Sequence, residues 1–319
     1  MSSVTVAPAP GATGVLPGTP VSRVRKKLTN PVASLVAVVI GIIWTVPTVG
    51  LLVSSIRPRL DQNLTGWWRG LTGPFTPDHY KSLTTGLEGD TSHSLVPYLV
   101  NSFVIVIPAT IIPITVASLA AYGLIWTKVK GRDWLFIAIF ALQIVPLQLA
   151  VIPLLNLFTN GWHLGSTTVI PDFGIGGHAA AIWIAHSCFG LPLIIFLLHN
   201  FMSEVPGDIV EAARIDGAGH GQIYRQIMLP LLMLAIAAIA IFQFLWVWND
   251  LFVGLIMGGG NPNINPITVK VQGLVSSSSG GGTELLPAAA FLSIIIPLVV
   301  FLALQRYFVR GLLAGSVKG

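Results

Sequence analysis

Residues 203–230 read Ser203-Glu-Val-Pro-Gly-Asp-Ile-Val-Glu211-Ala-Ala-Arg-Ile-Asp216-Gly-Ala-Gly-His-Gly-Gln-Ile-Tyr-Arg-Gln-Ile-Met-Leu229-Pro230. Proline suits the first turn of a helix, and an acidic residue there complements the helix dipole, so Pro206 and Asp208 predict the start of a helix. Gly217 and Gly219 are expected to end it, because glycine readily adopts the conformation that follows a helix. A second short helix is expected to follow, so the segment is predicted to be a stiff helix–turn–helix unit.

Long apolar runs flank this segment and recur along the chain. Only 9% of the 319 residues are charged and 53% are hydrophobic, whereas soluble domains carry roughly 25% charged residues. A helix needs about 20 mainly apolar residues to cross the hydrocarbon core of a bilayer. The runs of this length lie at about 32–53, 95–122, 134–158, 179–201, 231–256 and 285–307. The sequence therefore predicts an all-α, polytopic membrane protein with about six transmembrane helices.

The N-terminal residues 1–29 are rich in alanine, proline, glycine, serine and threonine, which is typical of a disordered tail. We therefore expect a tail at 1–29 and a transmembrane domain at 30–319. The first apolar run is too long for the core of a signal peptide, and no small-x-small cleavage site follows it. It is expected to remain in the protein as the first span.

The distribution of lysine and arginine predicts the orientation of the spans. Most of these residues fall in segments that share one side of the membrane if the N-terminus is cytoplasmic. The positive-inside rule then places both termini and the polar segment 202–230 in the cytoplasm. This distribution, rather than a surface for nucleic acid, accounts for the net charge of +5.

The helix–turn–helix segment offers a surface to a protein partner. Ala212 and Ala213 are adjacent and are expected to form one smooth face that another protein can approach closely. Glu211, Arg214 and Asp216 flank this face and would orient the approach. A rigid unit of this kind can transmit a push from a soluble protein into a membrane bundle.

The pattern Glu211-Ala-Ala-x-x-Asp-Gly-Ala218, followed by Tyr224 and by Leu229-Pro230, resembles the EAA loop of binding-protein-dependent ABC importers. In that family the loop forms a coupling helix, which sits in a groove on a separate ATPase subunit. The resemblance assigns this docking role to Glu211, Ala212, Ala213, Arg214, Ile215, Asp216, Gly217 and Ala218.

Further motifs extend the resemblance from about residue 30 to the end of the chain. They include Asn101-Ser-Phe, Ala120-Ala-Tyr-Gly123, Phe189-Gly-Leu-Pro192, Phe244-Leu-Trp-Val-Trp-Asn-Asp250 and the tail from Gln305. Together they resemble the maltose-type second permease family of carbohydrate importers. Gly66-Trp-Trp68 and the aromatic run 242–248 favour its α-glucoside or glucose branch. The outer loop Ser276–Gly282 departs from the family, because it contains only serine and glycine.

This resemblance implies an ABC-importer permease fold in the inner (plasma) membrane of a prokaryote. The implied function is the membrane-spanning subunit of an ATP-driven, binding-protein-dependent sugar importer, which forms half of the translocation path. The implied partners are a second homologous permease, an ATPase dimer, an extracytoplasmic sugar-binding protein, the sugar and membrane lipid, with no nucleic acid.

Motifs for chemistry are absent from the sequence. No G-x-x-x-x-G-K-[ST] occurs, and the seven histidines lack the spacing of a metal site. We therefore expect no catalytic residue, cofactor or metal in this chain, which would be a transport subunit rather than an enzyme. ATP and Mg are expected on the partner ATPase.

Polar and aromatic side chains within the spans are candidates for the sugar path, because lipid offers polar groups no hydrogen-bond partner. The amides could instead bond between helices, and the tryptophans could form an interfacial belt. The candidates are Gln143, Gln148, Asn156, Gln243, Trp246, Trp248, Asn249 and Asp250.

An ion-coupled secondary transporter is the alternative function. Such a carrier needs ionisable residues in the middle of the membrane. Asp250, near the edge of a predicted span, is the main candidate for this role. The sequence therefore favours the ATP-driven importer.

Overall fold

The computed structural model describes residues 31–86, 94–276 and 283–314, and most of them are helical. The predicted tail at 1–29 and nearly all of the Ser276–Gly282 loop lie outside these residues. Among the described residues, five helices are long and apolar enough to cross a membrane. They are α2 (Pro31–Ser55), α5 (Val96–Trp126), α8 (Ala179–Ser203), α11 (Leu229–Asn249, which continues the helical turns from His220) and α14 (Leu286–Ala314).

The predicted span 134–158 is two helices rather than one. α6 (Arg132–Ala141) and α7 (Leu147–Asn160) meet at an angle of 102°. Pro146 favours a break here, because proline has no backbone N–H and disfavours the helical conformation in the residue before it. Val145 is accordingly extended, with φ −69° and ψ 119°.

The bent pair forms the sixth crossing. α6 begins beside the end of α5, where Arg132 Nη1 donates a hydrogen bond to the carbonyl of Ile125 (3.2 Å). α8 begins at the opposite end of the bundle, where Ala181 and Ile182 belong to the same buried cluster as Leu95. α6 and α7 therefore join the two ends, and the prediction of about six spans is confirmed.

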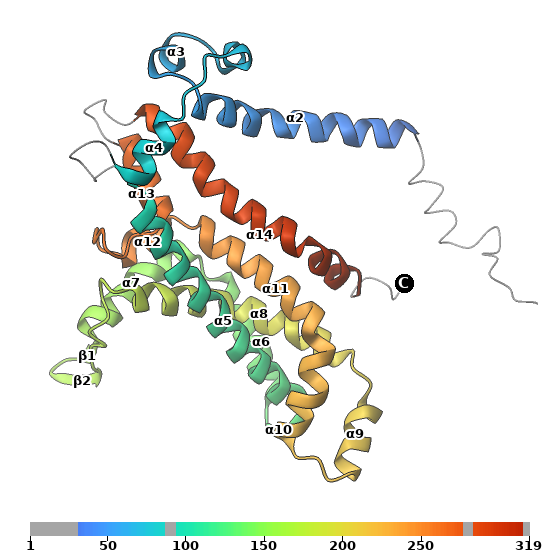
Figure 1. The fold of residues 1–319 in the computed structure, drawn as a ribbon. Helices are drawn as coiled ribbons and strands as arrows, with labels where there is room; N and C mark the ends of the chain where they lie inside the picture. The colour runs from blue at the N-terminus through green and yellow to red at the C-terminus, as the bar shows by residue number, and fades with distance from the viewer. Residues whose placement is uncertain (1–30, 87–93, 277–282, 315–319) are drawn as a thin grey trace, which may run out of the picture.

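The spans form a bundle in which α5 lies against α8, and α11 lies between α5 and α14 (Figure 1). Buried small residues on α5 and α8 allow the two backbones to approach closely, as is common between membrane helices. These residues are Ala109, Ala117, Ala121, Ala181 and Ala185. α2 extends away from the bundle and meets α14 near its own C-terminal end (Figure 1). Its buried residues are Gly50, Val53 and Ser55, so most of its apolar surface faces outward.

The segments between the spans gather at two opposite ends of the bundle (Figure 1). One end carries α3 (Arg59–Leu64), η1 (Trp67–Thr72), α4 (Asp78–Thr85), α12 (Phe252–Met257) and α13 (Ile267–Ser276). The other end carries α9 (Gly207–Ile215) and α10 (His220–Ile223). A short antiparallel hairpin of β1 (Trp162–Leu164) and β2 (Thr167–Ile170) precedes α8. The all-α prediction does not include this hairpin.

Two predicted boundaries differ from the structure. The fifth span, expected at 231–256, ends at Asn249, and α12 is a separate short helix. The polar segment expected at 202–230 is a loop only as far as Gly219, because the following residues are helical and lead into α11. The surface segment is therefore shorter, and more directly connected to the bundle, than the sequence suggests.

Candidate functional site

α9 is an exposed helix at one end of the bundle (Figure 1). It begins after Pro206, with Asp208 in its first turn and Arg214 in its last, as the helix dipole favours. It ends at Ile215, and Gly217 follows two residues later with a φ of +85°, which strains any residue with a side chain. The Ala218 N–H there donates to the carbonyl of Ala213 (2.9 Å). The helix thus begins and ends where the sequence predicts.

One face of α9 is buried and the opposite face is exposed. Val210 is fully buried and Ala213 is half-buried, both in the apolar cluster that includes residues of α5 and α8. Successive helical residues point about 100° apart, so Ala212 and Ala213 do not form the single smooth face that was expected. Ile215 is 86% exposed, the highest value among the large apolar side chains of the described residues. The outward surface comprises Glu211, Ala212, Ile215 and Asp216.

Arg214 fastens α9 to the end of α5. Its Nη2 donates to the carbonyl of Trp126 (2.9 Å), the last residue of α5. Carbonyls at the end of a helix have no partner within the helix, and a guanidinium is a favourable donor for them. Arg214 is therefore engaged inside the protein, and only part of its side chain remains for a partner.

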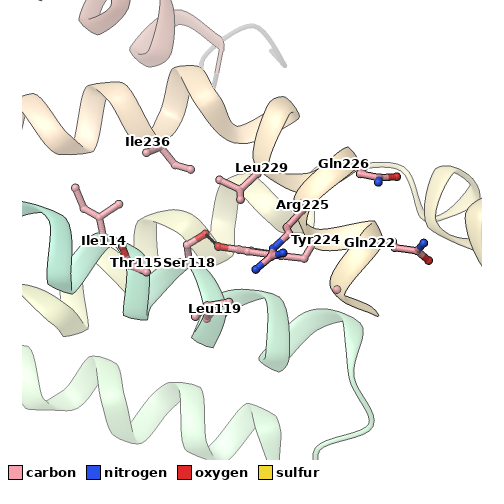
Figure 2. A pocket seen from close by; sticks show the side chains of 11 residues that line it. Ile114, Thr115, Ser118, Leu119, Gln222, Tyr224, Arg225, Gln226, Leu229 and Ile236 are labelled. Carbon is pink, nitrogen blue, oxygen red and sulfur yellow. Dashed lines mark hydrogen bonds between the residues drawn. The ribbon is translucent and has the colours of Figure 1, made fainter. Parts of the chain in front are cut away.

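Two further contacts join α10 and the next turn to α5. Tyr122 Oη lies 3.0 Å from His220 Nδ1. Ser118 Oγ lies 2.9 Å from Tyr224 Oη, a contact drawn in Figure 2. The rings of Tyr122 and Tyr224 also meet edge to face at 5.4 Å. Ser118, Tyr122 and Trp126 are four residues apart, so they lie on one face of α5. The whole loop is thereby attached to a single stripe of that helix.

The loop continues into α11 without a break. The Gly219 N–H donates to Gln222 Oε1 (3.0 Å) at the start of α10. A π-helical turn, η4 (Tyr224–Met228), then joins α10 directly to α11. Single π-turns within α-helices are rare and are frequent at functional sites. α10, η4 and α11 therefore form one continuous helical segment from His220 to Asn249.

A cavity of about 830 Å³ lies among α7, α8 and α11, beside the break at Pro146. Aromatic rings and amides share its wall, a combination that suits a ligand with both apolar faces and hydroxyl groups. The cavity is lined by Gln143, Gln148, Cys188, Phe189, Phe242, Gln243, Trp246 and Asp250, among others.

The cavity brings together five of the predicted path residues, and three others lie elsewhere. Asn249 lines an adjoining cavity of about 390 Å³ with Trp246 and Asp250. Trp248 is buried in the core, where its Nε1 donates to the carbonyl of Ser293 (3.0 Å). Asn156 is exposed on α7 and lines neither cavity.

Gln243 has both of the positions that the sequence left open for the amides, in the cavity wall and in a hydrogen bond between helices. It lines the cavity, and its Nε2 also donates to the carbonyl of Ala109 on α5 (3.1 Å). Its amide lies against Gly190 of α8, where an added Cβ would come within 2.9 Å of both amide heteroatoms. Gly190 therefore provides the space in which this interhelical hydrogen bond forms.

The substitution Gly190→Ala is expected to displace the Gln243 amide and break its bond to Ala109. Leaving a buried polar group unpaired costs about 1–3 kcal/mol, so the variant should unfold at a lower temperature. Gly123→Ala in α5 is the matched control, because apart from its chain neighbours and the nearby backbone of α5 no atom lies within 4 Å of the added Cβ. Thermal unfolding of the purified permease in detergent measures both variants, and equal melting temperatures would contradict the assigned contact.

Asp250 connects four elements at the end of α11. Its Oδ1 accepts a hydrogen bond from the Val253 N–H (2.8 Å) and so caps α12. Its carbonyl accepts from Thr268 Oγ1 of α13 (2.8 Å). His186 Nε2 of α8 lies 3.8 Å from the same carboxylate oxygen, and His186 is 1% exposed. Within the described residues, no group of three or more His, Cys, Asp or Glu could hold a metal ion.

Comparison with known proteins identifies the family. Residues 113–313 match the family described as the binding-protein-dependent transport system inner membrane component. The chain belongs to this family. The matched range contains α9, α10 and every lining residue of the 830 Å³ cavity. The protein is therefore a permease subunit of a binding-protein-dependent ABC importer, a multi-pass membrane protein and not a catalytic subunit.

Relatives of the permease carry related names. It is 44% identical to the osmoprotective compounds uptake permease protein GgtD of Synechocystis sp., over 88% of this chain and 89% of that protein. It is also 44% identical to the alpha-glucoside transport system permease protein AglG of Rhizobium meliloti, over 77% of this chain but 61% of AglG. The resemblance to sugar ABC importer permeases inferred from the sequence is confirmed.

A solved structure shares the fold of the permease. It belongs to a bacterial ABC transporter involved in the import of the acidic polysaccharide alginate, with a TM-score of 0.65. The match covers 91% of the permease and 98% of that chain, at 17% sequence identity. The predicted ABC-importer permease fold is confirmed.

Sequence reasoning missed the residues that attach the loop of the permease to α5. Ser118, Tyr122, His220 and Tyr224 are common residue types with no distinctive motif. The four-residue spacing of polar groups at the end of α5 was the available signal, because it places them on one helix face. Their partners in the loop could be matched to them only once the fold was known.

Proposed function

We propose that the permease forms half of a membrane path for a sugar and is driven by a separate ATPase that docks on α9. The observation that carries this proposal is the 830 Å³ cavity, whose wall includes the Trp246 and Phe242 rings and the Gln143 and Gln148 amides. Aromatic rings stack on the apolar faces of sugars, and amides bond their hydroxyl groups. The names of the relatives, which include an alpha-glucoside permease, support a sugar or a similar polyhydroxylated solute.

The partners follow from the surfaces that the permease offers. A second homologous permease would close the open side of the cavity, and an extracytoplasmic binding protein would deliver the solute. An ATPase dimer would contact Ile215 and the rest of the exposed face of α9. ATP and Mg belong to that dimer in this proposal, and the permease itself needs no cofactor.

The proposed orientation places α9, α10 and both termini in the cytoplasm of a prokaryotic cell, as the lysine and arginine distribution favours. Closure of the ATPase dimer would push on α9. Because the loop is bonded to α5 and runs directly into α11, this push would move both helices. α11 carries Gln243 and Trp246 in the cavity wall, so the cavity would open to alternate sides.

Uptake into membrane vesicles that contain the whole transporter tests this function. A labelled α-glucoside should accumulate only with the binding protein and ATP, and ionophores that abolish ion gradients should leave uptake unchanged. Accumulation by the permease alone, driven by a proton or sodium gradient, would show that it is a secondary carrier.

The variant Asp250→Asn separates the two functions further. Asparagine and aspartate cap helices about equally well, so the variant should keep the bond to Val253 and retain ATP-driven uptake within about threefold. An ion-coupled carrier that uses this carboxylate would lose transport altogether. Asp250→Ala is the control for capping, since it should cost about 1 kcal/mol of stability. Uptake rate and melting temperature measure the two effects separately.

A further inference from the structure

A second cavity, of about 700 Å³, lies between α5 and the segment that runs from α10 to α11 (Figure 2). It shares no lining residue with the 830 Å³ cavity. Its volume falls within the range of roughly 300–1,000 Å³ that is typical of ligand cavities. Its wall is mainly apolar, and the apolar side chains are Ile114, Leu119, Leu229 and Ile236.

Arg225 supplies a positive charge to this apolar wall. Its side chain reaches into the cavity beside Tyr224 (Figure 2). Within the described parts of the chain, it makes no hydrogen bond or ion pair. A guanidinium has five N–H donors in a fork that matches the oxygens of a phosphate. An exposed arginine beside an apolar wall is therefore complementary to an anionic group that carries an apolar chain.

Besides Arg225, the cavity is lined by the neutral amides of Gln222 and Gln226 and by three hydroxyl side chains that already have partners. Ser118 Oγ and Tyr224 Oη bond each other, and Thr115 Oγ1 donates to the carbonyl of Ile111 (2.8 Å). Arg225 also lies in the π-helical turn Tyr224–Met228, the kind of helix distortion that is frequent at functional sites. An anion in this cavity would thus bind through Arg225.

We propose that this cavity binds an anionic membrane phospholipid, with its phosphate on Arg225 and its first methylene groups against Leu119 and Ile236. Membrane leaflets rich in anionic lipids attract basic residues, and the apolar wall suits an acyl chain better than it suits a soluble anion. The lipid would bridge α5 and the start of α11. With the orientation proposed above, this lipid would come from the cytoplasmic leaflet. The choice of leaflet is the one part of the inference that rests on the proposed function.

Binding of a fluorescent phosphatidylglycerol to the purified whole transporter in detergent tests this site. Arg225→Gln should weaken binding about fivefold, the effect of one basic residue on anionic lipid. Arg225→Lys keeps the charge and should retain most of the affinity. Lys130→Gln removes an exposed charge from the connection between α5 and α6 and should change nothing. Fluorescent phosphatidylcholine has the same phosphate but no net charge, so it should bind the original protein more weakly than phosphatidylglycerol does.

Two further measurements distinguish the source of the anion. Leu119→Trp fills the apolar wall, so it should weaken binding of phosphatidylglycerol. Inorganic phosphate at millimolar concentration should not displace the lipid, and full displacement would show a site for soluble anions instead. Equal affinities of the original protein and Arg225→Gln would overturn the proposal. So would binding to the isolated permease that disappears in the complex, because a partner subunit would then cover the cavity.

These results are independent of the proposed function. The binding measurement needs neither ATP nor solute, so a failure of ATP-driven uptake would leave it intact. Conversely, if the original transporter took up the solute normally but did not bind phosphatidylglycerol in this cavity, only this inference would be overturned.

Discussion

The substitution Ile215→Asp is expected to stop transport while the permease still folds and inserts into the membrane. Ile215 is 86% exposed on α9, so its side chain is hardly packed against the described parts of the chain. Apolar anchors that enter a partner's groove contribute about 2 kcal/mol or more to binding, which is roughly a thirtyfold change in affinity. A buried carboxylate in the same place would cost more, because it would lose its hydration.

Co-purification of the ATPase and uptake in vesicles measure this effect. Ile215→Leu keeps the apolar surface and should retain both properties. Ile209→Asp makes the same chemical change on the same helix, about 120° around its axis from Ile215, and should have a smaller effect. If Ile215→Asp still retains the ATPase and transports normally, α9 is not the docking site.

Attachment of a bulky thiol reagent to Cys188 is the second change expected to have a large effect. Cys188 is the sole cysteine of the chain, is exposed, and lines the 830 Å³ cavity. A group attached there would occupy the space of the solute, so uptake should fall roughly tenfold or more, because a bound ligand fills such a cavity. The sugar should slow the labelling by competing for the same space.

Cys188→Ala is the control for this experiment, since other subunits can carry cysteines of their own. The variant should transport the solute normally and should resist the reagent. Unimpaired uptake after complete labelling of Cys188 would show that the cavity is not part of the path.

The sequence located the membrane spans because their signal is the length and hydropathy of single runs. It did not locate the 102° break between α6 and α7. α5 contains Pro108 and Pro113 and α8 contains Pro192, yet these helices continue through their prolines. Proline removes one hydrogen bond in each case, and the surrounding helices decide whether the chain turns there. Composition along the chain does not contain that information.

The candidate site was predictable to a similar extent. The start and end of α9 follow from local preferences, so Pro206 and Gly217 were recognisable. The cavity depends instead on the rotation of each helix about its axis. Trp246 and Trp248 are two residues apart, about 200° around the helix, so one lines the cavity and the other is buried in the core. Their sequence neighbourhood is almost identical, and packing alone distinguishes them.

The π-turn at Tyr224–Met228 joins α10 to α11 and so sets the rotation of the α11 side chains about the helix axis relative to those of α10. The helical segment from His220 to Asn249 is one continuous rod, with the attachment to α5 near one end and the Trp246 ring near the other. Removing a single residue from the rod would rotate everything beyond it by about 100° and shorten it by about 1.5 Å. The number of residues in this rod is therefore under constraint even where individual side chains are free to vary.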